Sequence, residues 1–128
     1  MTQSVKAMLE EANRAVEHIA APDVKALIDR SAAVVIDVRE PMEVGVTGKV
    51  PGAINIPRGL LEFKADADAP GHEPRLDKDK TIILYCASGG RSALAGQTLK
   101  EMGYKDVRNM GGFNDWDQEN FPVEPADA

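Results

Sequence analysis

The spacing of hydrophobic residues changes from one segment of the chain to the next. In residues 4–19 apolar side chains recur three or four positions apart, which predicts an amphipathic helix. Its apolar face comprises Val5, Met8, Leu9, Ala12, Val16 and Ile19. The polar face is not basic, so we expect this helix to pack on protein rather than on a membrane surface. A second helix is expected to begin at Pro22, because proline is favoured at the first helical position.

Two other segments are apolar without helical spacing. Residues 33–38 and 81–86 read AVVIDV and TIILYC, which is typical of strands that are buried on both faces. Shorter strands are expected over residues 53–56 and, after a turn, within residues 104–110. Residues 92–102 return to helical spacing. Strands that alternate with helices in this way predict an α/β fold with a mainly parallel central sheet.

Length, composition and charge narrow the classes of function. A chain of 128 residues forms one domain, and 43% apolar with 28% charged residues is typical of a soluble globular protein. The net charge of −6 argues against nucleic acid or an anionic membrane as a partner. No apolar run approaches the ~20 residues that span a bilayer, and the N-terminus has no secretory apolar region. We therefore expect a cytoplasmic protein.

The single cysteine, Cys86, stands where a buried strand is expected to end. One cysteine allows no internal disulfide and no cysteine-rich metal site, and a reducing cytoplasm would keep the thiol usable. Open α/β sheets bind ligands at the carboxyl ends of their strands. Although free cysteine is often a buried structural residue, this position favours a functional thiol.

The residues after Cys86 are suited to activating it. Gly89 and Gly90 let the backbone curl tightly, so that successive N–H groups can point at one spot. The helix that opens near Arg91 and Ser92 adds free N–H groups and the positive end of its dipole. Arg91 also adds a permanent positive charge. Each of these effects favours the thiolate, which is the nucleophilic form of cysteine.

Other nucleophiles and bases have less support. Ser88 lacks the G-x-S-x-G elbow of serine hydrolases and has no obvious partner base. The only histidines are His18, which is expected to be structural, and His72, which is expected to lie in a solvated loop. The sequence therefore gives little support to a Cys/His dyad.

The spacing from Cys86 to Arg91 leads to a family resemblance. Cysteine-dependent phosphatases have one more residue between cysteine and arginine than the four found here, Ala87, Ser88, Gly89 and Gly90. The six-residue loop from Cys86 to Arg91 resembles the active-site loop of the rhodanese family of sulfurtransferases. Three further segments resemble motifs of that family, DVREP at residues 37–41, GKVPGAINIP at 48–57 and GGFNDW at 111–116.

The resemblance covers residues 21–123 and implies the rhodanese fold. This is a three-layer α/β fold, with a mainly parallel central sheet and helices on both faces. Residues 1–20 are then an N-terminal amphipathic helix that packs on the domain, and residues 124–128 are expected to be a frayed tail. The N-terminal helix could instead contact a second copy or a partner, and the sequence leaves this choice open.

The resemblance also implies a mechanism and a set of site residues. The Cys86 thiolate takes the outer sulfur of a small anionic donor, either thiosulfate or a low-molecular-weight persulfide. It then passes the sulfur to a thiol, to cyanide or to an acceptor protein, with no metal and no organic cofactor. Arg91 is the second catalytic residue. The residues expected to bind the anion and the persulfide are Ala87, Ser88, Gly89, Gly90 and Ser92.

Three residues outside the loop are expected to support either the substrate or the structure: Asp37, Arg39 and Arg58. For Asp37 and Arg39 the structural role is favoured, because ion pairs near loops often perturb pKa values without taking part in chemistry. Arg39 is predicted to pair with Glu40 or Glu43. Arg58 follows a predicted strand end and is expected on the same side as Cys86.

Two positions depart from the family pattern. Ala87 stands where many members have a basic residue, so attraction for dianionic thiosulfate is expected to be weaker and a persulfide donor becomes plausible. Lys49 stands where histidine is common, and we expect it to be exposed with only its stem packed.

Three other classes of protein remain open. One is a sulfur-carrier or redox-sensing module with little turnover of its own. Another is a noncatalytic interaction domain, although such a domain need not retain both Cys86 and Arg91. A phosphatase or arsenate reductase is disfavoured by the short loop.

Overall fold

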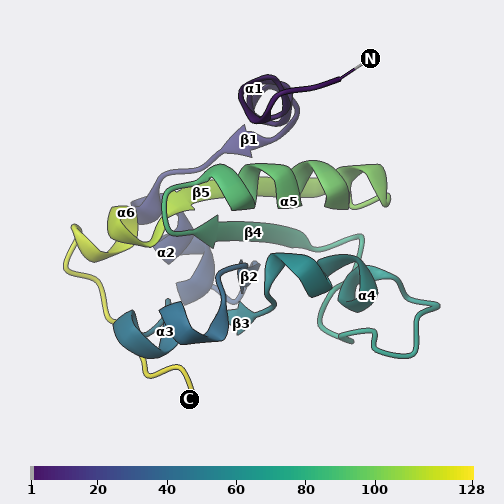
Figure 1. Cartoon of the computed structure of the whole chain (residues 1–128). Coiled ribbons are helices and arrows are strands. Elements are labelled where there is room, and N and C mark those ends of the chain that lie inside the picture. Colours follow the sequence, from purple (N-terminus) through teal and green to yellow (C-terminus); the bar gives the residue numbers. More distant parts are fainter. Residues whose placement is uncertain (1) are drawn as a thin grey trace.

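The computed structural model describes residues 2–128 and contains a five-stranded sheet with helices on both faces (Figure 1). The strands lie in the order β1-β5-β4-β2-β3, and every strand pair is parallel. Their bounds are β1 Glu17–His18, β2 Val34–Asp37, β3 Ile54–Asn55, β4 Thr81–Cys86 and β5 Asp106–Gly112. The helices are α1 Val5–Ala15, α2 Ala21–Asp29, α3 Pro41–Thr47, α4 Leu61–Ala65, α5 Gly90–Glu101 and α6 Phe113–Asp117, with a 3-10 turn η1 at Arg58–Leu60. The predicted α/β fold is confirmed.

The central strand β4 separates two hydrophobic cores. Alternate side chains of a strand point to opposite faces, so Ile82 and Leu84 join one core while Ile83 and Tyr85 join the other. The first core includes residues of α4 and α5, and the second includes residues of α2 and α6. This arrangement buries β4 on both faces. It places Cys86 at the carboxyl ends of the strands, where α3 and α6 also lie (Figure 1).

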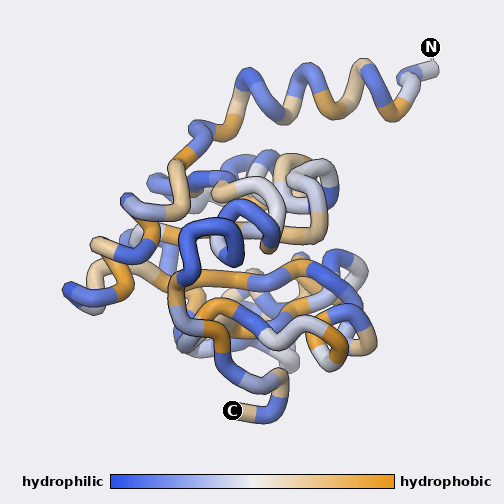
Figure 2. Tube along the Cα trace, turned by 90° about the vertical axis from the view of Figure 1, so that its left-hand side faces the viewer, coloured by the Kyte–Doolittle hydropathy of each residue, from blue (hydrophilic) through white to orange (hydrophobic). Residues whose placement is uncertain are grey.

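The N-terminal segment differs from the predicted helix of residues 4–19. The helix begins after Ser4, whose Oγ accepts the Ala7 N–H at 3.0 Å, and it ends at Ala15. Residues 17–18 form β1 beside β5, because pairing with a sheet edge satisfies backbone groups that a helix end would leave open. Figure 2 shows the N-terminal turns of α1 extending beyond the body of the molecule, and Val5 is 67% exposed.

The C-terminal segment pairs with the chain at Lys49. Lys49 is only 7% exposed, and its Nζ donates to the Ala128 carbonyl oxygen at 3.2 Å. The backbones of Lys49 and Glu124 form an antiparallel bridge with N–O distances of 2.9 and 3.0 Å. The Glu124 carboxylate also accepts the Gly52 N–H. The prediction of an exposed Lys49 is therefore wrong, because the side chain packs against the C-terminal segment.

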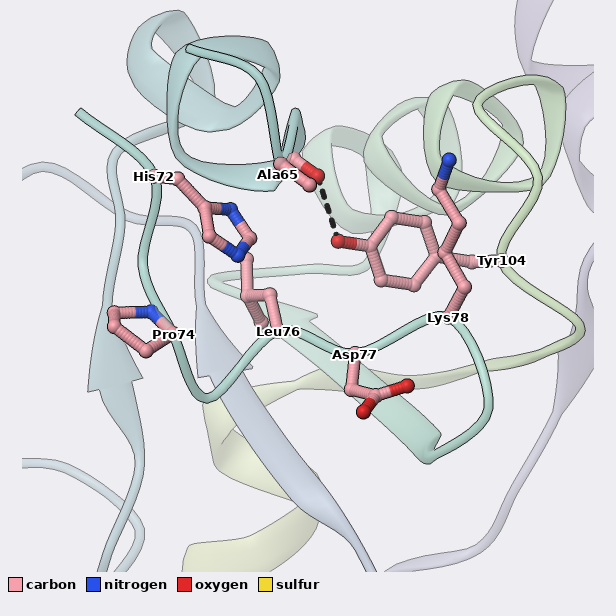
Figure 3. Close-up of a pocket in the computed structure, with 8 residues that line it drawn as sticks. Ala65, His72, Pro74, Leu76, Asp77, Lys78 and Tyr104 are labelled. Atoms are coloured by element: carbon pink, nitrogen blue, oxygen red, sulfur yellow. Dashed lines mark hydrogen bonds between the residues drawn. The ribbon is translucent and has the colours of Figure 1, made fainter. Parts of the chain in front are cut away.

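The connection over residues 66–80 lies at the amino end of β4, whereas Cys86 lies at its carboxyl end, because the connection leads into the start of this strand. It folds around Tyr104, whose hydroxyl donates to the Ala65 carbonyl oxygen at 2.8 Å (Figure 3). Residues of this connection line a cavity of about 320 Å³ together with Ala65 and Tyr104. His72 also lines this cavity, and its Nδ1 lies 2.9 Å from the Lys64 carbonyl oxygen. This loop therefore does not cover the cysteine. Within residues 2–128 no helix has the length and hydrophobicity needed to cross a membrane.

Candidate active site

Cys86 ends β4, and the chain turns sharply after it into α5. Gly89 adopts a φ of 103°, a left-handed conformation that favours glycine, and it directly precedes the first residue of α5. This turn directs the Gly89 N–H at the Cys86 sulfur, with an N–S distance of 3.0 Å. The predicted strand, glycine-rich loop and helix are therefore present in the expected order.

The Cys86 sulfur lies in a buried but polar environment. Cys86 is 1% exposed, and burial alone raises the pKa of its thiol. Hydrogen bonds from the Ser92 side chain and from backbone N–H groups of the loop outweigh burial, so the pKa is lowered overall. The Ser92 hydroxyl lies 3.4 Å from the sulfur. The loop thus favours the thiolate, as its sequence predicts.

Arg91 forms a two-bonded ion pair with Glu43 of α3. Its Nη1 and Nη2 lie 2.7 and 2.9 Å from the two carboxylate oxygens. The hydrogen bond from Arg91 is the main cause that lowers the pKa of Glu43 to about 2. The same contact raises the pKa of Arg91, and the negative charge of Cys86 raises it further. The guanidinium charge of Arg91 beside the thiol is therefore paired with the carboxylate of Glu43.

Glu43 is a site residue that sequence reasoning missed. The prediction that Arg39 pairs with Glu40 or Glu43 is wrong, because Arg39 pairs with Asp37 and the partner of Glu43 is Arg91, 48 positions away. Glu43 also accepts the Glu40 N–H at 2.9 Å and so closes a capping box at the start of α3. The Glu-x-x-Glu spacing before an apolar residue could have indicated this cap, but it could not indicate Arg91.

Asp37 and Arg39 pair with each other next to the C-terminal end of α3. Arg39 donates to the Asp37 carboxylate at 2.7, 3.0 and 3.2 Å, and both residues are at most 2% exposed. The guanidinium also lies 4.8 and 5.6 Å from the rings of Phe113 and Tyr85. It donates further to the Gly48 carbonyl oxygen. These contacts support the structural role, because they fix the segment that carries Glu43.

Arg58 does not contact the residues around Cys86. Its two terminal nitrogens donate to Glu62 at 2.9 Å and to the Thr98 hydroxyl at 3.0 Å. Thr98 belongs to the C-terminal half of α5, whereas the cysteine loop precedes that helix. The structure therefore uses Arg58 to join η1 and α4 to α5, and does not bring it to the loop.

Two features complete the surroundings of the loop. A cavity of about 390 Å³ opens beside it and is lined by Arg39, Thr47, Ala87, Phe113, Asn114 and Asp117. The glycine pair that ends β5 lets the backbone of the loop approach closely. A Cβ atom on Gly112 would lie 2.4 Å from the Ala87 carbonyl oxygen.

Among residues 2–128, no group of three or more His, Cys, Asp or Glu side chains could hold a metal ion.

The Gly112→Ala variant is expected to react more slowly with iodoacetamide at Cys86. The new methyl group would meet backbone, which cannot rotate away, so the loop must move and the Gly89 N–H leaves the sulfur. A hydrogen bond to a charged group is worth about 1.5–3 kcal/mol, so the thiol pKa should rise and below it the rate should fall about fourfold or more, since the higher nucleophilicity of the remaining thiolate offsets part of the loss. Gly45→Ala is the control, since nothing lies within 4 Å of its Cβ position. Equal rates for both variants and wild type would contradict this account.

Comparison with known proteins agrees with this geometry. The model of the rhodanese-like domain family matches residues 20–119. The chain belongs to this family. A sulfurtransferase of Allochromatium vinosum is 30% identical over 98 residues, covering 76% of this chain and 83% of the relative. The thiosulfate sulfurtransferase PspE of Escherichia coli is 40% identical over 80 residues, covering 62% and 70%. The family and these relatives support sulfurtransferase activity for this rhodanese-like domain at the level of the family.

A solved structure matches almost the whole rhodanese-like chain. It is a protein of unknown function from Rhodopseudomonas palustris, described as a possible tyrosine phosphatase. It is 41% identical, with a TM-score of 0.89, and the match covers 97% of this chain and 96% of that one. Similarity of fold does not decide between phosphatase and sulfurtransferase chemistry, because function depends on the site.

Proposed function

We propose that this rhodanese-like domain transfers sulfane sulfur through a persulfide on Cys86. The observation that carries the proposal is the short loop, in which the Gly89 N–H reaches the Cys86 sulfur at 3.0 Å. Four residues between Cys86 and Arg91 make a narrow cradle, which suits one extra sulfur atom better than a phosphoryl group. Ala87, Ser88 and the two glycines supply its backbone, and Ser92 adds a hydroxyl.

The first step of the proposed reaction loads the cysteine. The thiolate of Cys86 attacks the outer sulfur of the donor, so an S–S bond forms at Cys86 while the S–S bond of the donor breaks. From thiosulfate the leaving group is sulfite, which keeps the bonding electron pair. The negative charge left on the outer sulfur of the persulfide is stabilised by loop N–H groups and by Arg91.

The second step unloads the cysteine. A thiolate or cyanide attacks the outer sulfur, the S–S bond to Cys86 breaks, and the electron pair returns to Cys86 as the thiolate. No oxidant or reductant is consumed, and the sequence of steps is a double displacement. The cytoplasm is the proposed compartment, since its reducing poise keeps the thiol available.

A low-molecular-weight persulfide is the proposed donor in preference to thiosulfate. Ala87 adds no charge next to the nucleophile, and Glu43 partners the charge of Arg91. The protein as a whole carries a net charge of −6. Electrostatic attraction for a dianion is therefore weaker than a free arginine would supply.

The experiment that tests the proposed function is the intact mass of the protein after incubation with thiosulfate or with glutathione persulfide. We expect a gain of one sulfur atom that cyanide removes and that is absent from Cys86→Ser. Loading from neither donor would reject the sulfurtransferase proposal. Faster loading from thiosulfate than from the persulfide would reject the proposed donor only.

Two further outcomes separate the alternative functions. Stable loading with negligible turnover of small acceptors would favour a sulfur-carrier or redox module, with a protein as the acceptor. Hydrolysis of a chromogenic phosphate ester that depends on Cys86 would favour phosphatase chemistry, and we expect none.

A further inference from the structure

Asn109 of β5 lies behind the cysteine loop and is only 6% exposed. Its Oδ1 accepts the Gly111 N–H at 2.9 Å, and its Nδ2 donates to the Gly89 carbonyl oxygen at 3.2 Å. Because an N–H group can only donate and a carbonyl can only accept, these two contacts fix the orientation of the amide. The amide oxygen therefore faces Ser92, whose Oγ lies 2.7 Å away.

A bulge in β5 holds this amide in place. The register between β4 and β5 shifts at this point, so that Leu84 pairs with Asn109 while Tyr85 pairs with Gly111. Gly111 has a φ of 101°, which favours glycine. The Asn109 side chain bonds the N–H two residues further on, as asparagine does in Asx turns. Bulges next to active sites commonly redirect a side chain, and here the redirected side chain is Asn109.

Ser92 has one hydroxyl proton and two main acceptors for it. Its Oγ is 2.7 Å from Asn109 Oδ1 and 3.4 Å from Cys86 Sγ, while two backbone carbonyl oxygens lie at 3.2 and 3.5 Å. Ser92 is 0% exposed, so bulk water does not compete. With a neutral sulfur, the proton is best donated to Asn109. With a thiolate, the charge-assisted bond to sulfur is stronger and the hydroxyl turns toward it.

We propose that Asn109 is a positioning residue that controls the charge state of Cys86 through the Ser92 hydroxyl. By competing for that proton, Asn109 favours states in which Sγ is neutral. In the proposed sulfur transfer, on which this part rests, Sγ is neutral in the persulfide because the negative charge lies on the outer sulfur. Asn109 thus favours the loaded state. It also keeps the free thiolate more nucleophilic, since nucleophilicity falls with thiol pKa.

Other charged and titratable groups surround the cysteine and must stay constant in a test. They are Arg91 of α5, Glu43 of α3, Asp115 of α6, His18 of β1, and Asp37 and Arg39 at the end of β2. The Nε2 of His18 lies 3.9 Å from the position of a Cβ atom on Gly111. Repeating the measurement in a His18→Gln background therefore shows that the profile belongs to Cys86.

The test is the pH profile of iodoacetamide alkylation, which reports on Cys86 alone because the chain has one cysteine. Asn109→Leu removes the competing acceptor, so the thiol pKa read from the profile should fall by about 0.5–1 unit, the worth of one neutral hydrogen bond. Below that pKa the rate should rise about two- to threefold, because the lower nucleophilicity of the more acidic thiolate offsets about half of the gain. Ser92→Ala removes the donor, so the rate should fall. The double variant should behave as Ser92→Ala, because the effect of Asn109 passes through Ser92.

A second substitution guards against damage to the fold. Asn109→Asp keeps the acceptor for Gly111 and Ser92 and strengthens it, so the alkylation rate should fall, opposite in sign to Asn109→Leu. It also loses the donor to the Gly89 carbonyl oxygen and adds a negative charge that disfavours the thiolate directly, so only the part of its effect that disappears in the Ser92→Ala background is assigned to the Ser92 hydroxyl. Circular dichroism checks that each variant is folded. If Asn109→Leu does not fold, Asn109→Asp decides, and its effect should shrink when Ser92 is replaced by alanine.

Effects of Asn109→Leu and Asn109→Asp in the same direction would overturn the proposal. An Asn109 effect that is unchanged without the Ser92 hydroxyl would overturn it as well. Alkylation requires no sulfur donor, so these results stand whether or not Cys86 proves to carry sulfur. Failure of the sulfur-loading experiment is thereby distinguishable from failure of this inference.

Discussion

The Asp37→Ala variant is expected to be about 3–5 kcal/mol less stable than the wild type, because it leaves the charge of Arg39 buried without its counterion. Asp37 is 0% and Arg39 2% exposed, and three hydrogen bonds join them. Domains of this size are typically stable by about 5–15 kcal/mol, so the variant should lose a large share of its stability. Urea unfolding followed by fluorescence of the single, buried Trp116 measures the change.

Two controls show whether the stranded charge is the cause. Asp37→Ala combined with Arg39→Met removes both charges and should recover much of the lost stability. Asp29→Ala breaks the exposed Lys25–Asp29 pair and should change stability by about 0.5 kcal/mol or less. If the double variant were no more stable than Asp37→Ala, packing rather than charge would explain the loss.

The Arg91→Gln variant is expected to lower kcat/KM for thiosulfate by about a hundredfold or more, the usual cost of removing a donor that stabilises developing charge. The substitution removes the cation beside the sulfur and also strands the Glu43 carboxylate next to an anionic substrate. Both side chains of the pair are more than a third exposed, so stability should change little. Steady-state kinetics and thermal unfolding, measured together, check both statements.

Glu43→Gln separates the two causes of that loss. It frees Arg91 for the donor, so KM for thiosulfate should fall, although the introduced amide must also take over the helix cap. The double variant should lose less activity than Arg91→Gln, because no carboxylate is then stranded. An Arg91→Gln variant with wild-type kcat/KM would remove Arg91 from the proposed mechanism.

The fold was largely predictable because its signals are local. Apolar runs marked β2 and β4, and helical spacing marked α5. The cysteine loop was predictable for the same reason, since its cysteine, glycines and arginine are neighbours in sequence. The end of α1 was not predicted, because residues 17–18 leave the helix to pair with β5, a strand about ninety residues later in the chain.

The sequence by itself determined that a cysteine ends a buried strand, that a glycine-rich loop follows it, and the layer architecture, since spacing and residue type suffice for these. Only the tertiary structure decided which polar groups meet. Glu43 reaches Arg91 across 48 positions, Asn109 reaches Ser92 across 17, and Lys49 is buried against the C-terminal segment. Such partners carry no periodic signal, because a side chain's hydrogen bonds depend on which strand ends and helix starts the folded sheet brings together.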